Sequence, residues 1–241
     1  MLYIWPYIAF FSAPLVVGPL ARPAVALLPK QFQAFFERYH ITSKTSKFPE
    51  ILFLGVFILG AFFAVHFNTI IHPYTLADNR HYVFYAFRIL RRHPAIRYLA
   101  VPVYYTCAWL VANAVGVSPN NEQPLKQKRE NGHPTNIETG RTPCQISFFT
   151  IWLAATALSV VTAPLVEPRY FIIPWIIWRL HVPSASASLP SKEQSIRSWY
   201  DLRLGLETLW LLAIDVAVTY VFLYRGFEWP SEPGKLQRFL W

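Results

Sequence analysis

The chain has 241 residues, of which 54% are hydrophobic and 15% are charged. Soluble domains carry about a quarter charged residues, and here the deficit is concentrated in long apolar runs, which excludes an ordinary soluble domain. The net charge of +9 arises in the short segments between those runs, so anionic lipid head groups or a phosphate-bearing substrate are favoured over nucleic acid as partners.

The apolar runs predict an all-α, polytopic bundle of about five or six transmembrane helices, forming one membrane domain over residues 1–241. A sixth, shorter run either spans the membrane, re-enters it or lies in the interface. In chain order, the spans are expected at residues 3–21, 51–71, 98–117, 146–166 and 206–224, with the short run at 170–183.

The polar segments set the expected topology. Residues 118–145 are predicted to form a flexible loop, and residues 183–204 a linker with a low-complexity start. Four predicted spans precede Glu167, so the segment 72–97 and the segment 167–169 should face the same side of the membrane. Counts of Lys and Arg in the short loops weakly favour the opposite side as cytoplasmic.

The first segment that could carry chemistry surrounds Asp78, a candidate helix N-cap. A helix starting there would place His81, Tyr82 and Tyr85 on the same face as Asp78 and would end in arginines, Arg88 first among them. One interpretation is a site for a phosphate-bearing lipid, because Arg binds phosphate with two parallel hydrogen bonds. The other is an ordinary juxtamembrane helix with an aromatic belt and snorkelling arginines.

The second segment is Glu167-Pro-Arg-Tyr. Glu167 and Arg169 could simply pair or anchor the chain at the interface, or Arg169 and Tyr170 could join the first segment in one site. Farther along, Glu207 and Asp215 lie eight residues apart in a predicted span and are expected on roughly the same side of it. Acidic groups inside a membrane are usually functional or paired.

Familiar cofactor signatures are missing from the sequence. There is no Walker loop or H-E-x-x-H motif, and two cysteines at positions 107 and 144 make neither a disulfide framework nor a metal site. We therefore expect no metal ion and no nucleotide cofactor.

Three blocks in fixed order resemble a known enzyme family: LADNRHYVFY at 76–85, EPRYFIIP at 167–174 and QRFLW at 237–241. They resemble the dolichyl-phosphoglucose-dependent α-1,2-glucosyltransferases of the endoplasmic reticulum, which add the third, terminal glucose to the lipid-linked oligosaccharide used for N-glycosylation. The opening LYIWPY at 2–7 is similar to an internal span of the fungal members. The resemblance runs along most of the chain.

The resemblance implies a GT-C-type, metal-independent glycosyltransferase with dolichyl phosphate glucose as donor and a dolichyl-diphosphate oligosaccharide as acceptor. Both blocks would face the lumen. Arg80 and Arg169, and also Arg88, would stabilise the departing dolichyl phosphate. The substrate-binding residues expected on this basis are Asp78, Asn79, Arg80, His81, Tyr82, Tyr85, Arg88, Glu167, Arg169 and Tyr170.

The departures from the family are equally informative. The chain is similar to roughly the C-terminal half of the longer members, so we expect a truncated product or fragment, with an N-terminal half as a candidate partner. The family's acidic motif, which follows its first span and supplies the general base, has no counterpart before ADNRHY. The catalytic base is therefore unknown. The alternative is a non-catalytic membrane scaffold or regulatory subunit that keeps a lipid-phosphate-binding face.

Overall fold

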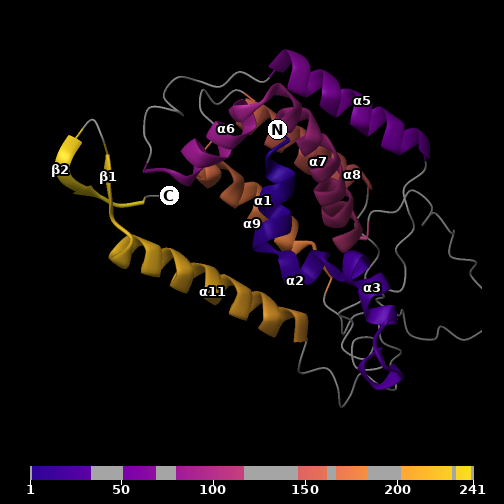
Figure 1. Ribbon diagram of the computed structural model, residues 1–241. Coiled ribbons are helices and arrows are strands. Elements are labelled where there is room, and N and C mark those ends of the chain that lie inside the picture. Colours follow the sequence, from indigo (N-terminus) through magenta and orange to yellow (C-terminus); the bar gives the residue numbers. More distant parts are fainter. Residues whose placement is uncertain are drawn as a thin grey trace, which may run out of the picture.

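The computed structural model describes residues 2–33, 51–68, 80–116, 146–161, 167–183, 202–229 and 232–239. This part of the chain is mostly helical, as the apolar runs predict (Figure 1). Its elements are α1 (Ile4–Phe11), α2 (Ala13–Val16), α3 (Gly18–Ala26), α5 (Ile51–Asn68), α6 (Tyr82–Arg92), α7 (Pro94–Ala114), α8 (Ile146–Val161), the 3-10 helix η2 (Pro168–Phe171), α9 (Ile172–Leu180), α11 (Leu202–Tyr224), β1 (Phe227–Trp229) and β2 (Glu232–Gln237).

Two of the described helices, α7 and α11, are long and apolar enough to cross a membrane. Shorter apolar helices occupy Leu54–Phe67 and Ser147–Val161, and the total of five or six spans stays a prediction. The loop predicted at 118–145 lies outside the described residues, as does most of the linker predicted at 183–204.

The first predicted span, at 3–21, is broken into α1, α2 and α3. Pro14 and Pro19 lie in the first turns of α2 and α3. A proline is tolerated there because its missing N–H has no partner inside the helix, whereas farther inside a helix it removes a backbone hydrogen bond and crowds the preceding turn. The prolines therefore turn one apolar run into a chain of short helices.

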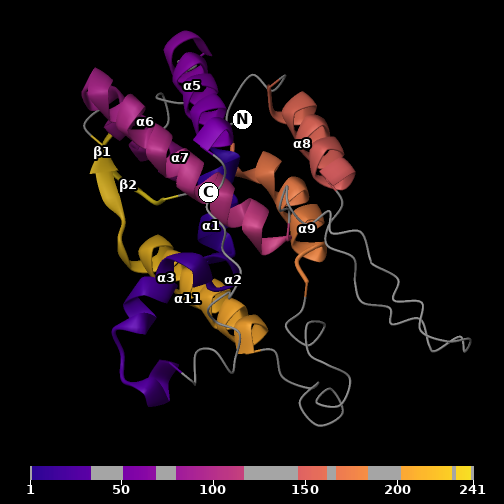
Figure 2. The same ribbon diagram turned by 90° about the vertical axis from the view of Figure 1, so that its right-hand side faces the viewer.

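The core lies where α1, α7 and α9 meet, with α8 on the outer side of α9 (Figures 1 and 2). Ile4 and Ile8 of α1, Val111 of α7 and Trp178 of α9 are fully buried there. Among apolar helices in lipid, such close packing replaces the hydrophobic effect as the main source of association.

Indole N–H groups tie these helices together. Each donates to a carbonyl or hydroxyl oxygen of another element, so no buried tryptophan in this set leaves its one donor unsatisfied. The bonds run from Trp152 to the Pro174 carbonyl (2.9 Å), from Trp175 to the Ser12 hydroxyl (2.8 Å), from Trp178 to the Val111 carbonyl (3.2 Å) and from Trp210 to the Phe10 carbonyl (2.7 Å).

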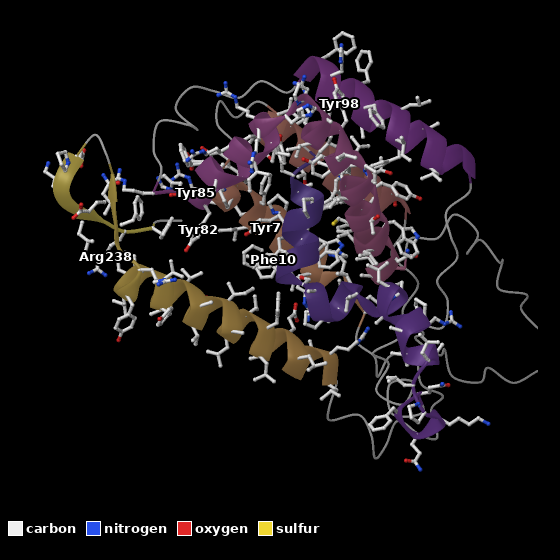
Figure 3. The ribbon with its side chains drawn as sticks, viewed as in Figure 1. Tyr7, Phe10, Tyr82, Tyr85, Tyr98 and Arg238 are labelled. Atoms are coloured by element: carbon white, nitrogen blue, oxygen red, sulfur yellow. The ribbon has the colours of Figure 1, made fainter. Side chains whose placement is uncertain are left out.

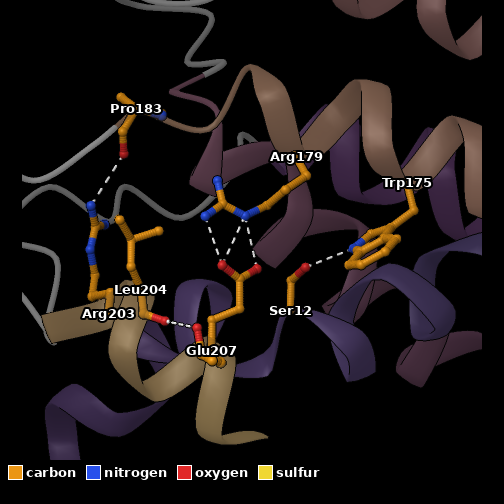
Figure 4. Close-up of polar contacts among 8 residues, drawn as sticks. Ser12, Trp175, Arg179, Pro183, Arg203, Leu204 and Glu207 are labelled. Atoms are coloured by element: carbon orange, nitrogen blue, oxygen red, sulfur yellow. Dashed lines mark hydrogen bonds and ion pairs between the residues drawn. The ribbon is translucent and has the colours of Figure 1, made fainter. Parts of the chain in front are cut away.

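Helix α11 lies beside α2 and is joined to α9 by an ion pair (Figure 4). The Arg179 guanidinium donates to both oxygens of the Glu207 carboxylate, with its closest contact at 2.7 Å. Glu207 is buried, whereas Asp215 is exposed. The expectation that the two acids share a side is therefore wrong, because eight residues on a helix of 3.6 per turn differ by about 80° in direction.

A short hairpin follows α11 and was not predicted. Strands β1 and β2 pair antiparallel, with Phe227 opposite Gln237 and a register shift between Glu228 and Trp229. Gly234 has φ 79°, a backbone conformation that favours glycine. The hairpin returns the chain from the end of α11 toward α6 (Figure 1).

Candidate functional site

Helix α6 carries most of the first predicted segment. It begins at Tyr82 with His81 as its N-cap, so the prediction of Asp78 as the cap of this helix is wrong. The helix starts only where buried packing starts, since Phe84 and Phe87 are its buried residues. Asp78 and Asn79 lie outside the described residues, and Arg80 is an exposed turn residue just before the helix.

Tyr82 and Tyr85 lie one turn apart on α6 and contact the C-terminal block QRFLW. Phe239 stacks on Tyr82, with ring centroids 5.7 Å apart, and contacts Tyr85 at the same distance with a tilted ring. Phe227 of β1 also packs on Phe239, with ring centroids 4.8 Å apart. Both tyrosines point toward the hairpin in Figure 3. Two blocks that lie far apart in the sequence therefore meet.

The neighbouring tail residue, Arg238, binds the end of α11. Its guanidinium donates to the Phe222 carbonyl at 2.6 Å and to the Leu223 carbonyl at 2.8 Å. The last carbonyls of a helix have no partner inside it and attract positive charge. Arg238 and Phe239 thus connect the end of α11 to α6 through the tail. In the sequence this block indicates only the family resemblance and has no assigned role.

An apolar cavity of about 350 Å³ lies where α6, α7 and η2 meet the start of α1. Phe87 of α6, Tyr104 of α7 and Phe171 of η2 form much of its wall. The other lining residues are Tyr3, Pro6, Val83, Ala86, Ile89, Leu90 and Pro168. The cavity brings α6 and η2 to one place, but its described lining includes none of the residues predicted to bind substrate.

The EPRY segment forms a local polar cluster beside that cavity. Arg169 is ion-paired with Glu167 and lies over the Tyr170 ring at 5.6 Å. Hydrogen bonding by Tyr170 and, after it, the charge of Glu167 raise the pKa of the Arg169 guanidinium above its ordinary value. The expected pairing of Glu167 with Arg169 is thus confirmed. A phosphate reaching Arg169 would have to share the guanidinium with this carboxylate.

The arginines at the end of α6 are more available. Arg88, Arg91 and Arg92 are exposed, and none of them has an ion pair with another described residue. Burial raises the pKa of the nearby Tyr85 hydroxyl, while the charge of Arg88 acts in the opposite direction. The residues immediately around the cavity therefore offer an apolar interior with guanidinium groups nearby, an arrangement suited to a lipid with an anionic head group.

A second polar cluster, between α5 and α7, was missed by the sequence reasoning. His66 and Tyr98 are joined by a hydrogen bond of 2.9 Å between Nδ1 and the phenol oxygen. Arg97 lies over the Tyr98 ring at 5.3 Å. Each residue lies at the end of an apolar run, and the two ends face the same side in the predicted topology. This shared side was the feature of the sequence from which a contact between His66 and Tyr98 could have been predicted.

The family model described as the DIE2/ALG10 family matches residues 1–180 of this chain. The match includes both segments that line the cavity. The chain belongs to the DIE2/ALG10 family.

Similarity to curated proteins extends along the full chain. Three fungal relatives named "Dol-P-Glc:Glc(2)Man(9)GlcNAc(2)-PP-Dol alpha-1,2-glucosyltransferase" each align with 100% of it: Aspergillus fumigatus (42% identical, 49% of the relative covered), Emericella nidulans (37%, 49%) and Pyricularia oryzae (39%, 44%). This chain thus spans about half the length of the curated relatives it matches. No solved structure matches it.

Within this DIE2/ALG10 family chain, α11 and the hairpin lie beyond the residues that the family model matches, yet the fungal relatives align through them. The contact of Phe239 with Tyr82 and Tyr85 links the two parts. The tail is therefore part of the same assembly as the family region, which is a reason to include it in any test of function.

Proposed function

We propose that this chain forms part of an α-1,2-glucosyltransferase of the endoplasmic reticulum membrane. The enzyme would transfer glucose from dolichyl phosphate glucose to the diglucosylated, dolichyl-diphosphate-linked oligosaccharide. The observation that carries the proposal is the 42% identity to the Aspergillus fumigatus relative along the whole chain. No observation favours the alternative of a non-catalytic scaffold.

The cavity supports a role in holding the lipid part of a substrate. Its lining is almost entirely hydrocarbon and aromatic surface from α6, α7, η2 and the start of α1. An isoprenoid chain is apolar and can pack against this surface without leaving a buried polar group unsatisfied. The segments 72–97 and 167–169 would then lie at the luminal surface, where the sugar is transferred.

The arginines near the cavity suit the phosphate. Breaking the glucose–phosphate bond leaves negative charge on dolichyl phosphate, and prearranged guanidinium groups stabilise developing charge. Arg88 is exposed and carries no ion pair with a described residue, so we assign it the first contact. Arg169 would act with Tyr170, its charge oriented by Glu167. Arg80 and His81 adjoin the start of the same helix and would contact the sugar or its phosphate.

The general base is not assigned to this chain. Glu167 is engaged in an ion pair with Arg169, so we do not assign it this role. The additional length of the relatives is the expected source of the base. Proximity of all reacting groups is needed for transfer, so we expect this chain to contribute binding residues and to be inactive by itself.

We also propose that transfer needs no metal ion or other cofactor, with dolichyl phosphate glucose as a substrate. Charge on the leaving phosphate would be balanced by arginine rather than by a divalent cation. In microsomes that contain the active enzyme, addition of EDTA should leave transfer of glucose unchanged. Loss of activity with EDTA, and its recovery with Mg²⁺ or Mn²⁺, would contradict the proposal.

Complementation tests the proposed function. This chain is expressed in cells lacking the terminal α-1,2-glucosyltransferase, alone and together with the upstream half of the Aspergillus fumigatus relative, and the mass of the lipid-linked oligosaccharide is read. We expect a gain of one hexose only with both parts, and loss of that gain with the R88Q variant. The complete relative is the positive control, and R225Q is a matched variant of an exposed arginine beyond α11. No gain with both parts present in the membrane would count against the proposal.

A further inference from the structure

Helix α11 carries two acidic residues with opposite surroundings. Glu207 is buried and accepts three hydrogen bonds from Arg179, whereas Asp215 is exposed and has no hydrogen bond or ion pair with any described residue. Asp215 lies two residues from the middle of a 23-residue apolar helix, within about 3 Å of its centre along the axis. At that depth in a bilayer neither water nor lipid can satisfy its carboxyl group.

Asp215 belongs to a stripe with regular spacing along the outer surface of α11. The stripe is defined by residues spaced alternately by three and four, all of them exposed: Gly205, Thr208, Leu212, Asp215, Thr219 and Phe222. This is the spacing by which one helix packs along another. The remaining outer surface, including Leu209, Val216 and Tyr220, consists of apolar or aromatic residues suited to lipid.

The composition of the stripe favours a helix rather than lipid. Four of its six residues are small or polar, the types that line helix contacts in membranes. A Cβ placed on Gly205 would meet nothing within 4 Å, so no described packing requires glycine there. Glycine weakens a helix by about 1 kcal/mol relative to alanine, and close approach of another helix is what compensates that loss.

We propose that this stripe docks a transmembrane helix whose side chain, Arg or Lys, binds Asp215. The helix belongs to the part of the family's length that this chain does not span, since the relatives are about twice as long. Charge complementarity excludes a symmetric pair of copies, because Asp215 would then face Asp215. The pair would repeat the chemistry of Arg179 and Glu207 about two turns farther along α11. The inference does not depend on glucose transfer.

Site-specific photo-crosslinking tests the proposal in membranes. Benzoylphenylalanine is placed at position 212, on the stripe, or at position 217, on another side of α11, in the chain expressed together with the upstream half of the Aspergillus fumigatus relative. We expect a crosslink to the upstream half from position 212 and none from position 217. D215L should lower the yield about threefold to tenfold, the range of one hydrogen bond between membrane helices, and A217L should leave it unchanged.

Three results would overturn the proposal. A crosslink from position 212 to a second copy of this chain would make the stripe a self-association surface. Crosslinks to lipid alone, with the chain resistant to carbonate extraction, would make α11 lipid-facing at Asp215. A yield unaffected by D215L would remove Asp215 from the contact. The D215N variant removes the negative charge and keeps the shape of the side chain. A crosslink yield for D215N between those of the wild type and D215L supports the pairing.

Discussion

The ion pair of Arg179 and Glu207 is the strongest polar contact between α9 and the long helix α11. Removing one partner of a buried pair leaves an unpaired charge, and this typically costs about 3 to 5 kcal/mol, whereas replacing both is far less costly. The side chains of Arg179 and Glu207 are 25% and 9% exposed, so this burial argument applies to them.

We therefore expect R179L to destabilise the chain in detergent by about 3 kcal/mol or more, and R179L/E207L to recover most of that loss. Thermal unfolding monitored by tryptophan fluorescence measures both, because tryptophans lie on α9 and on α11. R225L, a change at an exposed arginine just after α11, serves as the control. Equal destabilisation by the single and double variants would show that the pair acts through packing rather than charge.

Phe239 is the residue through which the tail reaches α6. Its ring contacts Tyr82, Tyr85 and Phe227, and each aromatic pair contributes about 0.5 to 1.5 kcal/mol beyond its buried area. We expect F239A to release the hairpin, so that trypsin cleaves after Lys235 and Arg238 at least about tenfold faster. L236A removes an exposed side chain, 63% accessible, from the same hairpin and should leave cleavage unchanged. Unchanged cleavage in F239A would mean that Arg238 alone holds the tail.

At the scale of single elements, α6 divides its surface among three neighbours. One side meets the tail through Tyr82 and Tyr85, another enters the core through Phe84, and a third lines the cavity through Ala86 and Leu90. A helix of eleven residues is marginal by itself, so these contacts stabilise it. The same helix thus links the apolar cavity to the basic residues at its end.

Filling the cavity should weaken binding of the lipid chain and leave binding of the head group unchanged. We expect A86L to weaken binding of a short polyprenyl phosphate to the purified chain about tenfold, the effect of displacing roughly two methylene groups. Binding of glucose 1-phosphate, which has no lipid, should be unchanged, and A95L at the exposed start of α7 should alter neither. Equal weakening of both ligands by A86L would indicate that the helix itself had been disturbed.

The elements also show what a sequence can predict. The apolar runs correctly indicated α5, α7, α8 and α11 because helix formation there follows from local composition. The start of α6 was misplaced, since it depends on burial of Phe84 and Phe87 rather than on a capping residue. The Arg179–Glu207 pair joins residues 28 positions apart, and the Phe239 contacts join still more distant ones. Such pairings depend on tertiary packing that a local pattern does not contain.

At the scale of the whole molecule, residues of α6 and η2 line one cavity. The expectation that the segments 72–97 and 167–169 face the same side of the membrane stays a prediction, and labelling from each side tests it. In a chain whose native cysteines are replaced by serine, R91C and R169C should react with an impermeant maleimide only after microsomes are permeabilised. K30C, from the opposite predicted side, should react in sealed microsomes. Labelling of R91C and R169C from different sides would refute the topology.

The pair of Arg179 and Glu207 also constrains the order of synthesis. Arg179 leaves the ribosome 28 residues ahead of Glu207, an interval of about one to six seconds at ordinary elongation rates. During that interval α9 carries a guanidinium whose partner has not been made, so release of α9 into lipid would expose an uncompensated charge. The contact of α9 with α11 can therefore form only after the first turns of α11 have been synthesised.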